Sequence, residues 1–135
     1  MPTEADFKRA IVRQLLLEGG FARRIEDKFA VGSLDMLLIT PLNTIYAEAK
    51  LLKGIAALPA SVAQRHQIEL VNRINNPTSR ALVIGLKDGM MCFGLPGERY
   101  DAHYLTPWPL VGPRSLMYHL DCAVGAVFNK VEEPA

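Results

Sequence analysis

Apolar residues recur at helical spacing near the start of the chain. Phe7, Ile11 and Leu15 are four positions apart, which places them on one side of a helix predicted over residues 3–18. Thr3 and Asp6 have the spacing of a capping box at its start. Glu18-Gly19-Gly20 supplies the glycine that commonly ends a helix.

Two apolar runs of strand length follow, over residues 34–40 and 44–50. The turn sequence Pro41-Leu42-Asn43 separates them. Strands so close in sequence are expected to pair as an antiparallel hairpin. Residues 21–33, which precede the hairpin, are expected to be irregular or partly stranded.

The second half of the chain predicts a helix, two strands and a last helix. Ser61 can cap a helix over 62–75, after a loop over 51–60. Strands are predicted over 80–86 and 90–94, and a stretch rich in Pro and Gly leads to a helix over 114–128. The fold class is therefore α/β, with a small mixed central sheet flanked by helices. The buried side of the helix over 62–75 is expected to consist of Val62, Ile68, Leu70, Val71 and Ile74.

Composition narrows the class of protein and the cellular compartment in which it is expected. The 135 residues are 50% hydrophobic and 21% charged, which fits one globular domain. Cys92 and Cys122 lack the spacing of a zinc site, and we expect a reducing intracellular compartment. We expect no transmembrane helix, because no apolar run is long enough to cross a membrane, and no signal peptide, because the first residues lack its basic and apolar stretches.

Charge is distributed unevenly along the chain. A net charge of +1 excludes a polycation of the histone type. Residues 50–80 are nevertheless basic, with Glu69 as their one acidic residue. A local basic surface is compatible with a nucleic-acid enzyme. The basic residues of this segment are Lys50, Lys53, Arg65, Arg73 and Arg80.

The candidate chemistry lies on the predicted hairpin. Asp35 is embedded in the first strand, and Glu48 and Lys50 alternate onto one face of the second. Two carboxylates held together repel each other unless one is protonated or a cation lies between them. Mg²⁺ suits such a pair, since one or two carboxylates, water and phosphate satisfy it. Lys50 could orient a water molecule or stabilise charge that develops on a phosphate.

These residues resemble a known family. Asp35 with Glu48-Ala49-Lys50 resembles the PD-(D/E)xK nuclease superfamily. The longer pattern of Gly32-Ser33-Leu34-Asp35, Glu48-Ala49-Lys50 and Ser61-Val62-Ala63-Gln64 is similar to its VRR-NUC and Holliday-junction-resolvase-like branch. That branch usually reads Gly-x-Pro-Asp, Glu-x-Lys and Ser-x-x-Gln, so Leu34 stands where many relatives have proline. The resemblance covers about residues 4–94, and small versions of this kind are common in phage genomes.

The predicted elements follow one another in the order α-β-β-α-β-β-α. The resemblance implies that residues 1–94 form a restriction-endonuclease-like core and that residues 95–135, which hold the last predicted helix, are an extension packed on the same domain. It implies that Mg²⁺ or Mn²⁺ is bound by Asp35, Glu48 and the main-chain carbonyl of Ala49. Lys50 would be the catalytic lysine. A further acid is expected in the first helix, with Glu4 preferred over Glu18 and Glu26. The glutamine near the active site would be Gln64, with Gln67 one turn on as the alternative.

The implied function is a metal-dependent DNA endonuclease, with branched or Holliday-junction DNA as a candidate substrate. The resemblance also implies a homodimer, and a phage-encoded chain would act in the cytoplasm of its bacterial host. If the chain is such an enzyme, basic side chains near the site are expected to contact DNA. The residues expected to do so are Lys53, Arg65, His66 and Arg73.

Simpler interpretations of the same residues stay open. Asp35 could be a solvated acid, and Glu48 and Lys50 a cross-strand ion pair. Trp108, with Tyr100 and Tyr104, could form a platform on which bases stack or could pack over the sheet. The whole chain could be an inactive nuclease-like fold that binds DNA or a protein as a phage factor. A structural component of a virion is a third possibility.

Overall fold

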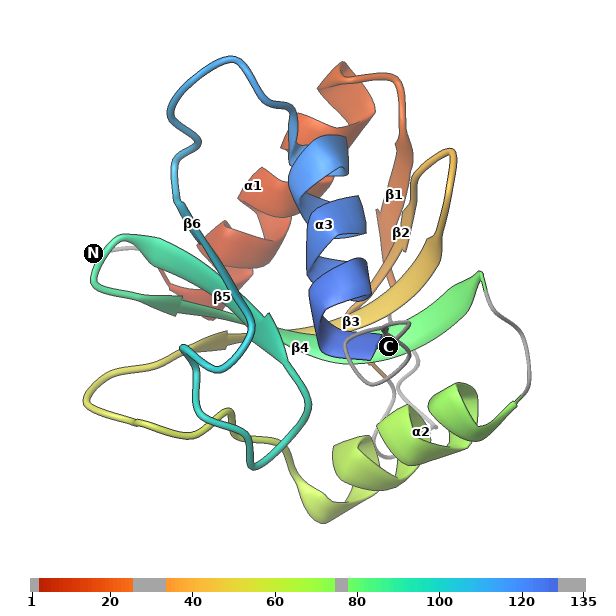
Figure 1. The fold of residues 1–135 in the computed structure, drawn as a ribbon, viewed down its shortest axis with the longest axis vertical. Coiled ribbons are helices and arrows are strands. Elements are labelled where there is room, and N and C mark those ends of the chain that lie inside the picture. Colours follow the sequence, from red (N-terminus) through yellow and green to blue (C-terminus); the bar gives the residue numbers. More distant parts are fainter. Residues whose placement is uncertain (1–2, 26–33, 75–77, 129–135) are drawn as a thin grey trace, which may run out of the picture.

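The structure, a computed structural model, describes residues 3–25, 34–74 and 78–128, and it is an α/β fold with one mixed sheet (Figure 1). The six strands lie in the sheet in chain order. Neighbouring strands are antiparallel except β3 and β4, which are parallel. The strands are β1 (Phe21–Arg24), β2 (Met36–Ile39), β3 (Thr44–Leu51), β4 (Ser79–Lys87), β5 (Met90–Gly94) and β6 (Tyr104–Pro107). The helices are α1 (Glu4–Leu17), α2 (Val62–Arg73) and α3 (Leu116–Phe128).

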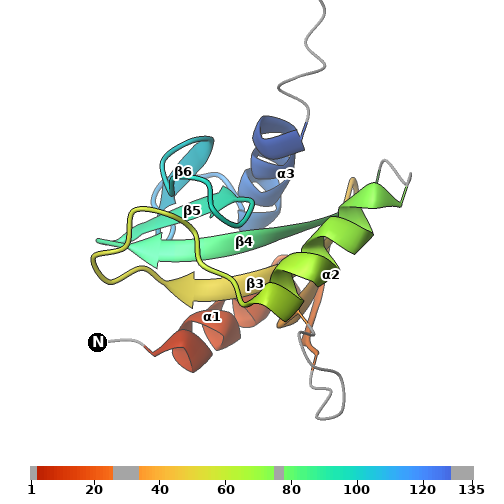
Figure 2. The ribbon, with the colours of Figure 1, turned by 90° about the horizontal axis from the view of Figure 1, so that it is seen from below.

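Helices cover both faces of the sheet. In Figure 1, α1 and α3 lie above β3 and β4, and α2 lies below them. The larger core cluster joins Phe7 of α1 and Leu120 of α3 to alternate strand residues such as Ile84. The smaller cluster, on the opposite face, joins Ile68 of α2 to Val83. Figure 2 shows α2 running beside β3 and β4 on its own side of the sheet.

The first helix forms as predicted. Thr3 and Asp6 cap each other's main chain in a capping box, and Phe7, Ile11 and Leu15 are buried. The chain turns away at Gly19, whose φ of 88° lies in the region that glycine adopts freely.

The predicted hairpin is confirmed as β2 and β3. Met36 pairs with Ala47, and Ile39 pairs with Thr44. Asp121 of α3 holds the turn, because one of its oxygens accepts hydrogen bonds from Thr40 Oγ1 and Asn43 Nδ2, each at 2.7 Å. The hairpin is therefore fixed to a helix that lies about eighty residues away in sequence.

A crossover through α2 makes β3 and β4 parallel. The loop after β3 is anchored by Leu52 and Leu58, which are 2% and 1% exposed. Gly85 is opposite Lys50 in the register, and a Cβ there would come within 2.7 Å of Leu52 Cδ1. Glycine at this position therefore lets the loop after β3 pack closely on the sheet.

The buried side predicted for the second helix is mostly wrong. Ile68 is buried and Val71 packs partly buried against the same cluster, whereas Val62, Leu70 and Ile74 are 88%, 43% and 61% exposed. Val62 is the first residue of α2, and Ile74 is the residue that caps its end. One narrow stripe of the helix makes the contact with the sheet.

Of the two edge strands, β1 agrees with a segment expected to be partly stranded, and β6, which lies in the Pro- and Gly-rich stretch, was not predicted. Each is four residues long with one buried side chain, Ala22 in β1 and Thr106 in β6. Such a short strand forms because a neighbour supplies its hydrogen bonds, and no alternating pattern marks it. No helix within the described ranges is long and apolar enough to span a membrane.

Candidate functional site

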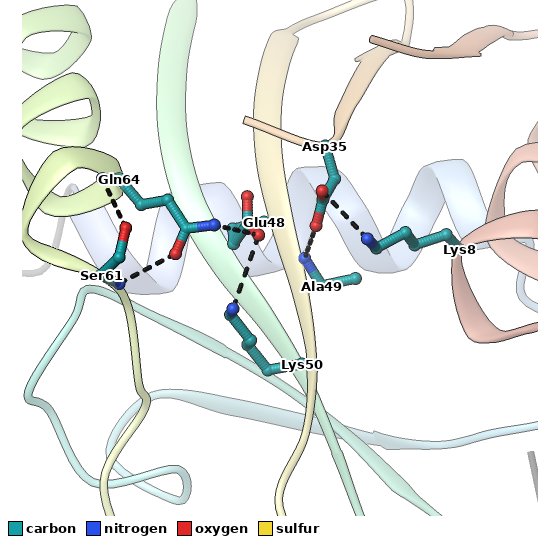
Figure 3. A network of polar contacts seen from close by, with 7 residues as sticks. All are labelled: Lys8, Asp35, Glu48, Ala49, Lys50, Ser61 and Gln64. Atoms are coloured by element: carbon teal, nitrogen blue, oxygen red, sulfur yellow. Dashed lines mark hydrogen bonds and ion pairs between the residues drawn. The ribbon is translucent and has the colours of Figure 1, made fainter. Parts of the chain in front are cut away.

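The side chains predicted to carry chemistry meet around the middle of β3 (Figure 3). Asp35 directly precedes β2, Glu48 and Lys50 belong to β3, and Gln64 lies in the first turn of α2. Glu48 and Lys50 share the face that α2 covers, as the alternation of a strand predicts. The structure therefore brings these four residues together from three elements. Gly32 and Ser33 of the motif lie outside the described residues.

Asp35 occupies the open edge of β3. Its Oδ2 accepts a hydrogen bond from the main-chain N–H of Ala49 at 3.2 Å, beyond the last residue that β2 pairs. Its main-chain carbonyl accepts from Ile25 at 2.8 Å, so the end of β1 holds it in place. The N–H and C=O of one strand residue point to the same side. The Ala49 carbonyl therefore faces the same open edge as the Asp35 carboxylate.

Glu48 is a buried acid with one unsatisfied oxygen. Its side chain is 2% exposed, and Oε1 lies 2.6 Å from Gln64 Nε2 and 3.7 Å from Lys50 Nζ. Oε2 is buried and has no hydrogen-bond partner. Burial, and next the Asp35 carboxylate, raise the pKa of Glu48 to about 8, although Lys50 and Lys8 oppose that shift. A buried acceptor without a donor is costly, so the site is suited to a proton or a cation.

Gln64 has a fixed orientation. Ser61 caps α2, accepting from the Gln64 main-chain N–H at 3.1 Å and donating its own N–H to Gln64 Oε1 at 2.9 Å. Since Oε1 is used in this capping box, Nε2 is the atom directed at Glu48. This geometry favours Gln64 over Gln67 as the glutamine of the site.

Lys8 is a member of the site that the sequence did not single out. Its Nζ lies 3.0 Å from Asp35 Oδ1, and the two side chains are 17% and 19% exposed. Lys8 lies beside the buried stripe of α1, a position at which a sequence predicts an ordinary solvent-exposed lysine. No local pattern in the sequence marks Lys8 as a partner of Asp35, because this contact depends on how α1 crosses the sheet.

The acids expected from the first helix separate in the structure. Glu4 is half-buried one turn before Lys8, on the same side of α1 by its i, i+4 spacing. Glu18 lies at the other end of α1, where its carboxylate accepts hydrogen bonds from the main-chain N–H groups of Leu116 and Met117 at 2.7 and 2.9 Å. It caps α3 there, and Glu26 lies outside the described residues.

The predicted DNA-contacting residues do not form one surface. Arg65 and Arg73 line a hollow of about 490 Å³ between α2 and the segment after β5. We call it the arginine hollow. Its other lining residues are Ile68, Glu69, Asn72, Leu95 and Pro96. Lys53 lines a separate cleft beyond the end of β3, and His66 is exposed on α2.

The atoms of the site that could bind a metal ion are all oxygens. They are the carboxylates of Asp35 and Glu48 and the main-chain carbonyl of Ala49. Within the described ranges, no three His, Cys, Asp or Glu side chains gather in a metal-binding group. Two carboxylates and a carbonyl match the small set of protein ligands that Mg²⁺ needs, since water and phosphate complete its shell. Glu48 Oε2, which is buried and has no hydrogen-bond partner, would be one of these ligands.

No model of a known protein family matches this chain, and no curated protein matches it.

Proposed function

We propose that this protein is a DNA endonuclease of the PD-(D/E)xK type that depends on Mg²⁺ or Mn²⁺. The observation that carries the proposal is the buried carboxylate of Glu48, whose Oε2 has no partner, beside Asp35 and Lys50. A fold gains no stability from an unsatisfied buried acid. Residues that reduce stability in this way are typical of functional sites.

Asp35, Glu48 and the Ala49 carbonyl would hold the ion. A bound dication polarises a phosphodiester and lowers the pKa of a water molecule. Glu4, on the same side of α1 as Lys8, is the candidate for an additional ligand. Both carboxylates can be ionised together only when a positive charge compensates them.

Lys50 has the position of a catalytic lysine. Its side chain is 21% exposed, and its Nζ lies 3.7 Å from Glu48 Oε1, so it can reach both solvent and the site. There it would orient a water molecule or stabilise negative charge on the phosphate. Gln64 would keep Glu48 in place, because its amide is already fixed by the cap of α2.

The order of helices and strands supports the proposal that the fold contains a restriction-endonuclease-like core. Without the short edge strands β1 and β6, the chain runs α1, β2, β3, α2, β4, β5, α3. We assign the series from α1 to β5 to a restriction-endonuclease-like core, and the segment after β5, which contains β6 and α3, to the extension. The parallel pair β3 and β4, joined by α2, would then place the acid pair beside the first turn of that helix.

Cleavage assays test the proposed function. The purified protein is incubated with plasmid, branched and single-stranded DNA, with Mg²⁺, with Mn²⁺ or with chelator. We expect cleavage that needs the metal and is lost in Lys50→Ala and Glu48→Gln, while Asp101→Asn, a change at an exposed acid far along the chain, retains it. Equal cleavage by all variants would identify a contaminant, and no cleavage of any substrate by folded protein would refute the proposal.

A second candidate function is a nuclease-like fold that only binds DNA or a protein. The ion pair between Lys8 and Asp35 favours it, because Lys8 supplies Asp35 with a positive charge without any metal. A Mn²⁺ titration separates the two candidates, since a binding module has no reason to bind the ion. The enzyme is further proposed to be a homodimer that acts in the host cytoplasm, and light scattering measures its oligomeric state.

A further inference from the structure

A second cleft lies where β3 and β4 end. Its volume is about 650 Å³, within the range of small-ligand sites. The first half of α1, the turn between β4 and β5, and the segment after β6 enclose it. We call it the tryptophan cleft. Its apolar lining consists mainly of Phe7, Ala10, Leu51, Leu86, Trp108 and Pro109.

Trp108 gives this cleft a preformed aromatic wall. The indole packs against the larger core, and its ring centroid lies 6.2 Å from that of Phe7 at an interplanar angle of 71°. Its main-chain N–H donates to the carbonyl of Gly89 at 2.9 Å, which fixes the segment to the turn after β4. An indole held in this way can stack on a planar ring without paying for its own ordering.

The charges at the rim of the cleft balance, because Asp6 and Asp88 are opposed by Lys53 and Lys87. Asp6 is engaged by Thr3 in the helix cap and by Arg9 at 3.2 Å. Asp88 lies 3.8 Å from Lys87. Lys53 is exposed at the rim and has no ion-pair partner within the described ranges. An ammonium group beside an apolar aromatic cleft suits a ring that carries a phosphate.

The tryptophan cleft adjoins the candidate active site through β3. Leu51, which lines the cleft, is two residues beyond Ala49, a distance of about 7 Å along a strand. Leu51, Leu86 and Trp108 pack on the α1 side of the sheet, whereas Glu48 and Lys50 lie on the α2 side. A strand held at Asp35, at the open edge of β3, would therefore place a neighbouring nucleotide in the cleft by passing around the end of β3. The ends of parallel strands are also where α/β folds commonly bind ligands.

We propose that the tryptophan cleft binds an unpaired base of the DNA strand that the active site cuts. This inference rests on the proposed nuclease function and deepens it by naming a substrate class: DNA with unpaired nucleotides beside the cut. A base inside a duplex is stacked on both faces, and it reaches an aromatic pocket only after it leaves the stack. A single strand, an overhang or a flap presents such a base without that cost.

Binding through the cleft can be measured without catalysis, because Trp108 is the one tryptophan of the sequence. Its fluorescence is followed in the presence of chelator while a short oligothymidylate, a blunt duplex, or the same duplex with an unpaired overhang is added. We expect quenching by the oligothymidylate and by the overhang, and little change with the blunt duplex. Equal responses to all three probes, or no response to any, would overturn the inference.

A substitution that fills the cleft gives the second test. Ala10→Phe places a ring in the cleft from α1 and leaves Trp108 in place, and Ala10→Ser is the matched control that keeps the cleft open. Because stacking on an aromatic side chain governs such binding, we expect Ala10→Phe to weaken oligothymidylate binding by roughly tenfold to a hundredfold. Circular dichroism verifies that both variants are folded. Unchanged affinity in folded Ala10→Phe would overturn the inference.

The two proposals fail in different ways. If the protein cuts no DNA but oligothymidylate quenches Trp108 and Ala10→Phe removes the quenching, the cleft binds bases and the nuclease proposal fails. If the protein cuts a blunt duplex as fast as the overhang, and Ala10→Phe changes neither rate, the nuclease proposal stands and the inference about the cleft is wrong.

Discussion

The side-chain amide of Gln64 donates a hydrogen bond of 2.6 Å to Glu48 Oε1, and so joins the first turn of α2 to the middle of β3. The same amide accepts from the main-chain N–H of Ser61 through its oxygen. One residue therefore caps a helix and orients a buried acid. The start of the crossover helix and the candidate active site are consequently one structural unit.

This double role predicts an unequal effect of two similar substitutions. Gln64→Leu removes the hydrogen bond to Glu48 and half of the capping box, and we expect it to cost about 1–2 kcal/mol of stability. It should also reduce metal-dependent cleavage at least tenfold, because Glu48 loses its only observed donor other than Lys50. Gln67→Leu, one turn on, is the matched control and should leave both unchanged. Denaturant unfolding and cleavage rates measure the two effects, and equal losses in both variants would contradict the assignment of Gln64.

Glu48 itself should show opposite effects on stability and on activity. Glu48→Gln keeps the acceptor for Gln64 but removes a charge that is buried at a 2% exposed position. We expect the variant to be at least as stable as the original chain near pH 8, because no buried carboxylate has to ionise. Cleavage should fall at least a hundredfold, since a dication loses a ligand. Lower stability together with unchanged cleavage would show that Glu48 is structural.

The raised pKa of Glu48 also predicts how stability depends on pH without metal. The folded protein has a pKa of about 8 at this group, against 4.5 for an ordinary glutamate. Between these values the folded state binds more protons than the unfolded state, so stability falls as pH rises from about 4.5 to 8. The loss is a few kcal/mol at most. Thermal melts in chelator across this range measure it, with Glu48→Gln as the control that lacks this contribution.

The sequence predicted which side chains of the candidate site lie together, but it did not predict the contacts that surround them. Asp35, Glu48, Lys50 and Gln64 meet because strand alternation, a hairpin and a helix cap are local features that a sequence displays directly. The pairing of Lys8 with Asp35 depends on how α1 crosses the sheet, which no local pattern encodes. The same holds for β1, although its end positions the main chain of Asp35 through Ile25.

The structure also separates two acids that the sequence treats alike. Glu4 and Glu18 both flank the apolar stripe of α1, and spacing alone gives no reason to choose between them. Glu18 accepts hydrogen bonds from two N–H groups at the start of α3, so its carboxylate is already engaged. The position of α3 decides its role, and that position follows from packing between segments about a hundred residues apart.

Lys8 is expected to raise the stability of the metal-free protein and to lower its affinity for Mn²⁺. Its ammonium group, 3.0 Å from Asp35 Oδ1, stabilises the metal-free site and repels a dication. Lys8→Met should therefore lower stability by about 1–2 kcal/mol, since both side chains are mostly buried. It should strengthen Mn²⁺ binding severalfold in a calorimetric titration. Arg9→Met, which breaks the exposed pair with Asp6, is the control and should change Mn²⁺ affinity little. Weaker Mn²⁺ binding in Lys8→Met would show that Lys8 helps to build the metal site.

The arginine hollow predicts the salt dependence of DNA binding. Arg65 and Arg73 line it together on the α2 side of the sheet, the side on which Glu48 and Lys50 lie. If each contacts one phosphate, replacing both with alanine should reduce the slope of log affinity against log salt by about 1.4 to 1.8, since each contact releases about 0.7 to 0.9 counterions. Affinity should fall for every DNA sequence alike, because phosphate contacts carry no base information. Arg114→Ala, at an exposed arginine that stacks on Tyr118, is the control and should leave the slope unchanged. Fluorescence anisotropy at several salt concentrations, with metal replaced by chelator, measures the slopes. An unchanged slope in the double variant would place the DNA on another face of the molecule.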